Sequence, residues 1–374
     1  MLERVNILKQ RSTHSGKLER WLGRDEVARI SAGMADWYGP DIAVAATPGL
    51  VYARKGGDFV GNIDGGGFSN LVDTARALSK ALARRQSRCF NAGFADLADL
   101  QFEATKGGKL RTYYFEKTGP NLGRTIDLWG ASTYPAAGAS GGAAPGGTAW
   151  TDASTGAHPF NNPDSGDTQH FVGGEVRVAA GATAYRCHLL YDRIFSVAKT
   201  MNSTATEAVT GVPTRYQSTV STDEDYAGGN FLFPTALTNL PATAHSWTVC
   251  TYLDQGGNAS TLPSVAGVSS AAANGLDLAA PLWFMPLEAG DTGVQALTQM
   301  QCNAAVASGT IDFSIGHPIA WLPQVGRSIQ NVVNGINSAF QVTRVLDDAA
   351  LALLALQIDA DGTGNIGFFQ TVSG

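Results

Sequence analysis

The chain has 374 residues, of which 44% are hydrophobic and only 16% are charged. This length corresponds to one large domain or two ordinary ones, and the apolar content excludes a disordered polymer. The formal net charge of −6 excludes a general electrostatic attraction to nucleic acid. The charge is unevenly spread, because residues 1–130 carry +5 and residues 131–374 carry −11. We therefore expect the N-terminal third to meet a different environment from the rest of the chain.

The N-terminal region is predicted to be partly helical. Residues 16–34 have apolar side chains at helical spacing, and Leu50–Ala53 is a short strand candidate. The clearest helix spans residues 69–88, with Ser69 as a good N-cap. One apolar stripe follows this helix at Leu71, Ala75, Leu78 and Leu82.

The same helix also carries a basic stripe. Its members are Arg76, Lys80, Arg84, Arg85 and Arg88. Two interpretations stay open. The stripe is either a solvated helix face or a surface that meets acidic chains or nucleic acid, because unneutralised cations speed association with anionic surfaces.

The amino-acid composition changes after the predicted helices. Residues 110–116 and 124–129 are expected to form a β-hairpin around Pro120, Asn121 and Gly123. Residues 135–168 are rich in Gly, Ala, Ser and Pro and have no period, which is typical of a linker or long loop. We therefore expect an N-terminal arm and helical region with a hairpin over 1–134, a linker or loop over 135–168, and a β-rich domain over 169–374.

The C-terminal region is predicted to form strand after strand. The candidates are short, rich in β-branched and aromatic residues, and separated by turn residues. They lie at 174–178, 185–197, 230–233, 246–253, 282–285, 294–303, 310–315, 319–322, 340–346, 351–358 and 366–372. Residues 346–356 would also suit a capped helix. The predicted fold class is α+β, a partly helical N-terminal region followed by a predominantly antiparallel β-sandwich or jelly-roll-like domain.

Two glycine-rich motifs near the C-terminus have structural explanations. Gly362–Gly367 fits the dinucleotide pattern G-x-G-x-x-G, but only seven residues follow it, so no helix and acidic partner can complete the fingerprint. Asp359, Asp361 and Thr363 resemble the start of a calcium loop, but the expected bidentate Glu is replaced by Gln370. We expect a strand turn in both cases, with calcium binding as the minor alternative for the second.

The sequence points to no catalytic, cofactor or metal site. His158, His170 and His188 are spaced too loosely for a metal site, and we expect polar-loop histidines at the first two positions and a core or interface histidine at the third. No nucleophile elbow, zinc-protease motif or P-loop occurs. We expect four reduced cysteines, Cys89, Cys187, Cys250 and Cys302, because they are widely spaced and residues 1–10 contain no secretory apolar stretch. No apolar run is long enough to span a membrane.

Four stretches of the second half resemble a known class of proteins. They read GGEVRVAAG (173–181), ATEAVTGVPTRY (205–216), PLEAGDTGV (286–294) and IGHPIAWLP (315–323). Together they resemble virion structural proteins encoded by tailed bacteriophages, over residues 170–374. The resemblance implies a repeated building block of the particle, and it carries over no functional residue.

The expected function is therefore that of a non-enzymatic structural protein of the virion head, either the shell subunit or a decoration protein bound to it. The expected partners are copies of itself, other head proteins and packaged DNA at the basic stripe, with no cofactor and no membrane. The expected location is the virion, after assembly in the host bacterial cytoplasm. A tail or fibre component that binds a host surface is the main alternative, and a small-ligand enzyme or carbohydrate-binding module is the third. Between a jelly roll and the tailed-phage shell fold, the sequence leaves the choice open.

Overall fold

The protein was analysed as a computed structural model, which divides the chain into two compact units, residues 1–88 and residues 89–374. The described residues are 42–47, 50–55, 58–64, 94, 97–119, 122–159, 161–164, 166–178, 186–217, 229–279, 282–323, 331–334, 343–357 and 364–374. The predicted helices at 16–34 and 69–88 lie outside these residues.

In the first unit, three strands form an antiparallel sheet in the order β1-β2-β3. They are β1 (Ile42–Thr47), β2 (Leu50–Lys55) and β3 (Asp58–Asp64). The predicted strand at Leu50–Ala53 is confirmed as the first part of β2.

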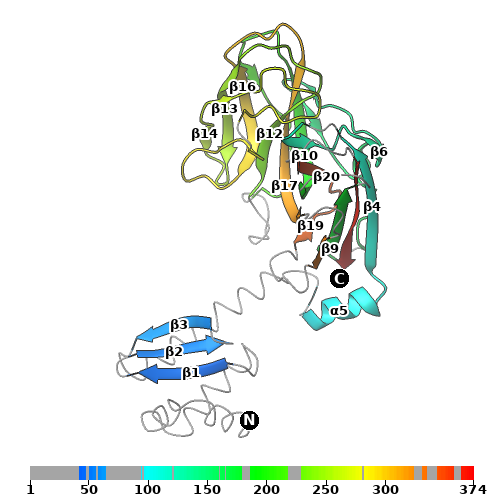
Figure 1. Ribbon diagram of the computed structural model, residues 1–374, viewed down its shortest axis with the longest axis vertical. Helices are drawn as coiled ribbons and strands as arrows, with labels where there is room; N and C mark the ends of the chain where they lie inside the picture. The colour runs from blue at the N-terminus through cyan, green and yellow to red at the C-terminus, as the bar shows by residue number, and fades with distance from the viewer. Residues whose placement is uncertain are drawn as a thin grey trace. The chain divides into compact units, whose positions relative to one another are not determined.

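The second unit is built mainly from three antiparallel sheets (Figure 1). The seven-stranded sheet contains β5 (Thr125–Asp127), β7 (Gly142–Ala143), β8 (Thr148–Ala149), β10 (Arg186–Thr200), β12 (Phe231–Ala236), β17 (Thr310–Pro323) and β20 (Leu351–Gln357). The six-stranded sheet contains β4 (Leu110–Thr118), β6 (Ser132–Tyr134), β9 (Gln169–Val178), β18 (Asn331–Asn334), β19 (Arg344–Val345) and β21 (Gly364–Ser373). The five-stranded sheet contains β11 (Glu207–Ala208), β13 (Ser246–Asp254), β14 (Ala259–Thr261), β15 (Val265–Ala266) and β16 (Val294–Cys302).

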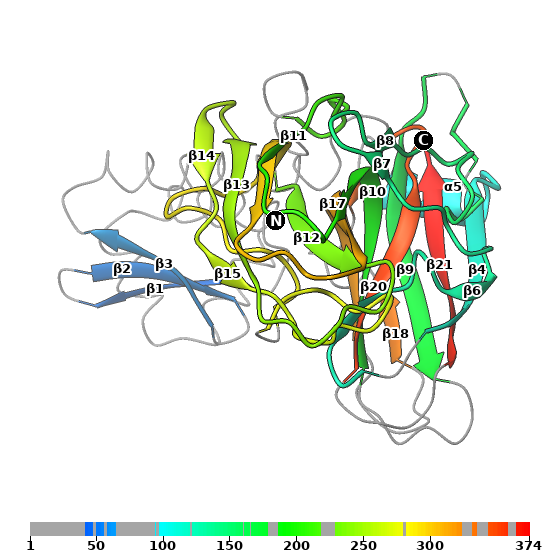
Figure 2. The ribbon, with the colours of Figure 1, turned by 90° about the horizontal axis from the view of Figure 1, so that it is seen from above.

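The seven-stranded sheet is the middle layer. Figure 1 and Figure 2 both show β13 and β14 on one side of β10 and β17, and β4 and β9 on the other. Residues 188–197 of β10 are all buried, as expected for a strand that is covered on both faces. One apolar cluster joins the middle sheet to the five-stranded sheet, and a second joins it to the six-stranded sheet. The predicted antiparallel β-sandwich is confirmed, and a third sheet extends it beyond the two layers of a jelly roll.

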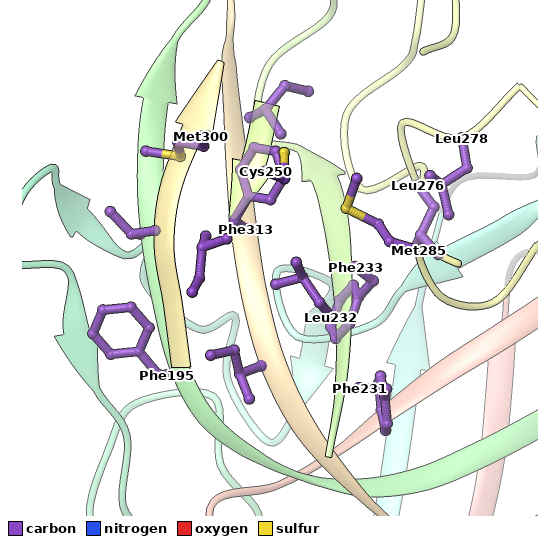
Figure 3. Packing of buried hydrophobic residues seen from close by; sticks show 14 of the residues in the cluster. Phe195, Phe231, Leu232, Phe233, Cys250, Leu276, Leu278, Met285, Met300 and Phe313 are labelled. Carbon is purple, nitrogen blue, oxygen red and sulfur yellow. The ribbon is translucent and has the colours of Figure 1, made fainter. Parts of the chain in front are cut away.

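Aromatic and sulfur-containing side chains fill the core next to the five-stranded sheet. Figure 3 shows Phe313 of β17, Cys250 of β13 and Met300 of β16 gathered between the strands. The ring of Trp247 meets Phe313 edge to face, with ring centroids 4.6 Å apart. Such edge-to-face pairs stabilise a core by about 0.5–1.5 kcal/mol beyond the burial of their area.

A buried arginine ties three strands of the middle sheet together. Arg193 of β10 is 1% exposed, and its Nη1 donates to Asp127 Oδ2 on β5 at 2.6 Å. Its Nη2 donates to Asp312 Oδ2 on β17 at 2.8 Å. Asp127 also accepts hydrogen bonds from the Tyr191 hydroxyl and the Trp129 backbone N–H. Burial acts to lower the pKa of Arg193, but the neighbouring groups, Asp127 first and then Tyr191 and Asp312, together outweigh it, so the pKa is raised and the guanidinium stays charged.

A glycine-rich cover, residues 138–150, closes over this arginine. The backbone N–H of Gly141 donates to Asp312 Oδ1 at 3.2 Å, and Trp150 Nε1 donates to Ser196 Oγ at 2.7 Å. Strands β7 and β8 of the cover pair with β10. We expected a linker and a domain boundary in residues 135–168, whereas this cover contributes to the core of the second unit. Glycine allows the close approach, since a Cβ on Gly147 would lie 2.2 Å from Phe195 Cζ.

Two predicted elements are wrong. Strands β4 and β5 do not form a hairpin, because β4 pairs with β6 and β21, while β5 pairs with β20 in another sheet. The burial of β5 explains why it pairs with β20 and not with β4, since all three of its residues are buried in the middle layer. The stretch 282–285 is a loop and not a strand, although Trp283 and Phe284 pack against the core.

The other strands of the C-terminal half follow the predictions closely. Predicted strands at 310–315 and 319–322 are one long strand, β17, and only β19 is seen of the strand predicted at 340–346. Residues 351–357 form strand β20 and not a capped helix, because both of its faces are buried. The described helix α5 (Leu97–Thr105) lies in neither predicted helical range.

The buried arginine generates the first prediction. Replacing Arg193 with Met should destabilise the protein by about 3–5 kcal/mol, because Asp127 and Asp312 then remain buried without a cation. Urea unfolding followed by tryptophan fluorescence measures this. The control Lys106→Met removes an exposed cation and should stay within about 0.5 kcal/mol of wild type. Equal stability of the two variants would contradict the role given to Arg193.

The glycine-rich cover generates the second prediction. Gly147→Ala should destabilise by about 1–3 kcal/mol, because φ is +58° there and the added methyl group meets Phe195 and the Ser196 carbonyl. Gly146→Ala is the matched control, since nothing lies within 4 Å of its Cβ position. Thermal unfolding of the two variants should therefore separate them clearly, and identical melting temperatures would show that the cover tolerates a side chain.

Candidate functional site

The outer face of the six-stranded sheet is the candidate functional site. Side chains alternate along β4, so that Tyr113, Phe115 and Lys117 point into the core while Tyr114 and Glu116 point outward. On β21 the outward residues include Ile366 and Phe368, which are half-buried. We call the group formed by Tyr114, Glu116, Tyr134, Arg177, Ile366 and Phe368 the open sheet face.

Aromatic rings dominate one side of the open sheet face. Tyr114 is 49% exposed and Tyr134 is 44% exposed, which is unusual for large rings that could pack in a core. Their ring centroids lie 6.2 Å apart, with an angle of 26° between the planes. The Tyr114 hydroxyl donates to Glu116 Oε2 at 3.0 Å, and this hydrogen bond raises the pKa of Tyr114. Together the two rings present apolar surface beside a carboxylate.

The register places these residues in two rows across the sheet. The first row runs from Tyr134 on β6 through Glu116 on β4 and Ile366 on β21 to Arg177 on β9. The second row runs from Tyr114 through Phe368 to Glu175. Each row therefore has an apolar side chain on the central strand and polar side chains on both flanks. Such an apolar centre with a polar rim is typical of protein interfaces.

Helix α5 covers only one end of this sheet. Leu100 of α5 and Phe94 pack on Val172 and Val372 and form a small separate cluster. The open sheet face lies beyond this cluster along β4 and β21. Exposed aromatic and apolar side chains gathered in one place mark an interaction site more often than single exposed residues do.

Behind the open sheet face, the side chain of Lys117 holds the inner layer in place. Lys117 is 2% exposed, and its Nζ donates to the carbonyl oxygens of Pro135, Ala131 and Ala136 at 2.8, 3.2 and 3.3 Å. Burial lowers the pKa of Lys117 to about 8, against a partly compensating effect of Asp127. The contacts attach the chain around residues 131–136 to the inner side of β4.

The histidines singled out from the sequence are buried. His158 lies edge-on to Phe115 and Phe369, and His170 lies edge-on to Phe94, so neither is the polar-loop histidine that we expected. Burial lowers the pKa of each to about 3. His188 is a core histidine, and its Nε2 lies 2.9 Å from Asn365 Oδ1. Of the two predicted roles, core or interface histidine, the structure shows the first.

His245 and Asp277 form a histidine–aspartate pair, the composition of a catalytic dyad, but both side chains are buried and hold two segments of the chain together. His245 Nε2 lies 2.9 Å from Asp277 Oδ2, which also accepts from Trp247 Nε1. The other oxygen of Asp277 accepts from the Val268 backbone N–H at 2.7 Å. All these side chains are buried. The pair thus attaches the loop after β15 to β13.

The remaining sequence-based candidates have the following outcomes. Arg76, Lys80, Arg84, Arg85 and Arg88 lie outside the described residues, as do Cys89 and the acidic positions of the calcium-like loop, Asp359 and Asp361. Cys187, Cys250 and Cys302 are free thiols. Among the residues that the structure describes, no group of three or more His, Cys, Asp or Glu side chains could hold a metal ion. Over the same residues, no helix is long and apolar enough to cross a membrane.

Comparisons with known proteins give little guidance. No protein-family model and no curated protein sequence matches the chain. It is similar to a structure of infectious bursal disease virus, Gt strain, with 10% identity and a TM-score of 0.15, covering 71% of this chain and 80% of that chain. It is also similar to the VP2 subviral particle of infectious bursal disease virus, with 11% identity, a TM-score of 0.14 and the same coverage. Scores of this size do not establish a shared fold or function.

The sequence-based reasoning missed every residue of the open sheet face. The alternation in LRTYYFEKT contains the signal, but both faces of β4 carry an aromatic residue, and the inward face also carries Lys117. Hydrophobicity alone therefore cannot tell which face is exposed. The rows across the sheet join segments more than 180 residues apart, which no local pattern predicts.

The buried histidines generate the third prediction. Between pH 3 and 6.5 the folded chain holds His158 neutral while the unfolded chain protonates it, so stability falls as the pH drops below 6.5. His158→Phe removes this one proton linkage and keeps an aromatic ring between Phe115 and Phe369. The slope of unfolding free energy against pH over pH 5–6 should then decrease by about 1.4 kcal/mol per pH unit. Urea unfolding at several pH values measures it, and an unchanged slope would contradict the neutral, buried state of His158.

Proposed function

We propose that this protein is a structural protein of a tailed-phage virion, a component of the head that acts by self-assembly and not by catalysis. The open sheet face is the observation that carries the proposal. It presents exposed aromatic rings and half-buried apolar side chains on one face of a sheet, and aromatic residues are enriched where proteins associate. The resemblance of residues 170–374 to tailed-phage virion proteins supports the same conclusion.

The interior supports a structural role as well. The buried charged side chains of the middle layer are paired with one another, as Arg193 is with Asp127 and Asp312. Arg215 likewise forms a two-pronged pair with the buried Asp192, at 2.6 and 2.8 Å. Since these groups are engaged in holding strands together, they supply rigidity to a building block. The proposed partners are copies of the same chain and other head proteins, in the virion and, before that, in the host bacterial cytoplasm.

The test is assembly by the purified full-length chain. Light scattering and negative-stain microscopy over the micromolar range should show ordered oligomers or shell-like particles. A chain that stays monomeric, and that makes no contact with its own copies in particles, would overturn the proposal. Shells would favour the shell subunit, discrete oligomers that bind preformed heads would favour decoration, and binding to bacterial cells would favour the tail or fibre alternative.

A fourth prediction concerns the tyrosines of the open sheet face. The double variant Tyr114→Ser/Tyr134→Ser should weaken self-association by about tenfold or more, because exposed aromatic anchors dominate interface energies. Its thermal unfolding should match wild type, since both rings are about half exposed. Leu282→Ser is the control and should assemble normally, because Leu282 is an exposed loop residue outside the open sheet face. Wild-type assembly by the double variant would exclude these rings from the contacts.

A further inference from the structure

The charges on the open sheet face are arranged so that the face complements itself. In the first row Glu116 and Arg177 lie on opposite flanks of Ile366, one strand away on each side. Two strand spacings separate their backbones by about 10 Å, and no ion pair joins their side chains within one copy. Among the residues that the structure describes, no carboxylate lies within ion-pair distance of Arg177, which is exposed. The face thus carries an acid and a base on either side of an apolar strip.

From this arrangement we propose that the open sheet face binds the same face of a second copy, about a two-fold axis parallel to β21. The inference rests on the proposed function, for which it names one contact between copies. A two-fold axis makes an isologous interface, in which residue i meets residue j and residue j meets residue i. Rotation about β21 exchanges the flanks β4 and β9. Glu116 of each copy then lies opposite Arg177 of the other, and the ion pair is made twice.

The second row fits the same axis. Ile366 and Phe368 lie on β21, so each meets its own counterpart at the centre and loses its exposed apolar surface. Tyr114 on β4 comes opposite Glu175 on β9, so that its exposed ring is covered by the second copy. An axis across the strands would instead turn Arg177 toward Glu175, which is only 9% exposed. The exposed cation and the more accessible carboxylate, Glu116, therefore favour the axis along β21.

The partner is a second copy and not an unrelated chain because of this charge pattern. A face that binds a strongly acidic or basic partner carries an excess of one sign. The first row of this face carries one cation, Arg177, and one carboxylate, Glu116, at mirrored positions, which matches its own rotated copy. Its apolar centre with a polar rim is also the anatomy expected of a protein–protein contact.

Charge reversal across two copies tests the inference. The full-length variants Glu116→Arg and Arg177→Glu each place like charges opposite each other twice in a pair of identical copies. Each should weaken self-association by about tenfold or more, measured by sedimentation velocity at matched salt. Mixing the two variants should restore association as one-to-one pairs, detected by native mass spectrometry, because Arg at position 116 then meets Glu at position 177. If Glu116 paired with Arg177 inside one copy, mixing the two variants would not restore association.

The controls separate this inference from the proposed function. Glu288→Arg reverses an exposed charge beside the five-stranded sheet and should associate as wild type does. Circular dichroism and thermal unfolding verify that every variant is folded, which is expected because Glu116 and Arg177 reach solvent. If wild type assembles but the two variants assemble equally well, or if mixing does not rescue them, the two-fold contact is wrong and the proposed function stands. If wild type never self-associates, both fail.

Discussion

The fold of the second unit depends on one buried cation. Arg193 joins Asp127 on β5 to Asp312 on β17 across the middle sheet, and neither carboxylate has access to water. Because an unpaired buried charge is far more costly than a paired one, the three side chains fix the spacing of strands that no sequence proximity holds together. The guanidinium also lies 5.0 Å from the centre of the Trp129 ring, so an aromatic side chain packs against the ion pairs.

The glycine-rich cover follows from this constraint. Only one carboxylate oxygen of Asp312 binds Arg193, and the other accepts a hydrogen bond from the Gly141 backbone N–H. A chain that approaches β10 this closely has no room for side chains at Gly141 and Gly147, and the ring of Trp129 leaves none at Gly138. The composition that is typical of a flexible linker is here required by close packing. The same residues that make the segment seem mobile in the sequence allow it to lie flat on the sheet.

The three-layer arrangement also explains where an interaction surface is left. The middle sheet is covered on both faces, and its charged residues are used internally. The six-stranded sheet buries its inner face, where Lys117, His158 and Phe115 pack, and one end of its outer face under helix α5. The rest of its outer face carries the rings that remain outside the core. A surface built on paired strands costs little backbone entropy when it binds, because the strand pairing already orders its backbone. Such a surface suits a repeated contact between copies, as the proposed virion role requires.

The sequence by itself determined that the C-terminal region is an antiparallel β-sandwich, and it located most of the strands there. Short segments rich in β-branched and aromatic residues, bounded by turn residues, placed β9, β10, β12, β13, β16, β17, β20 and β21. The tertiary structure alone decided which strands are neighbours, so that β4 pairs with β21 and not with β5. It also decided that residues 138–150 are a packed cover, since glycine content cannot distinguish freedom from close approach. The open sheet face belongs to the same category, because Tyr114, Arg177 and Phe368 come together only through pairing between distant strands, and local periodicity carries no information on such pairing.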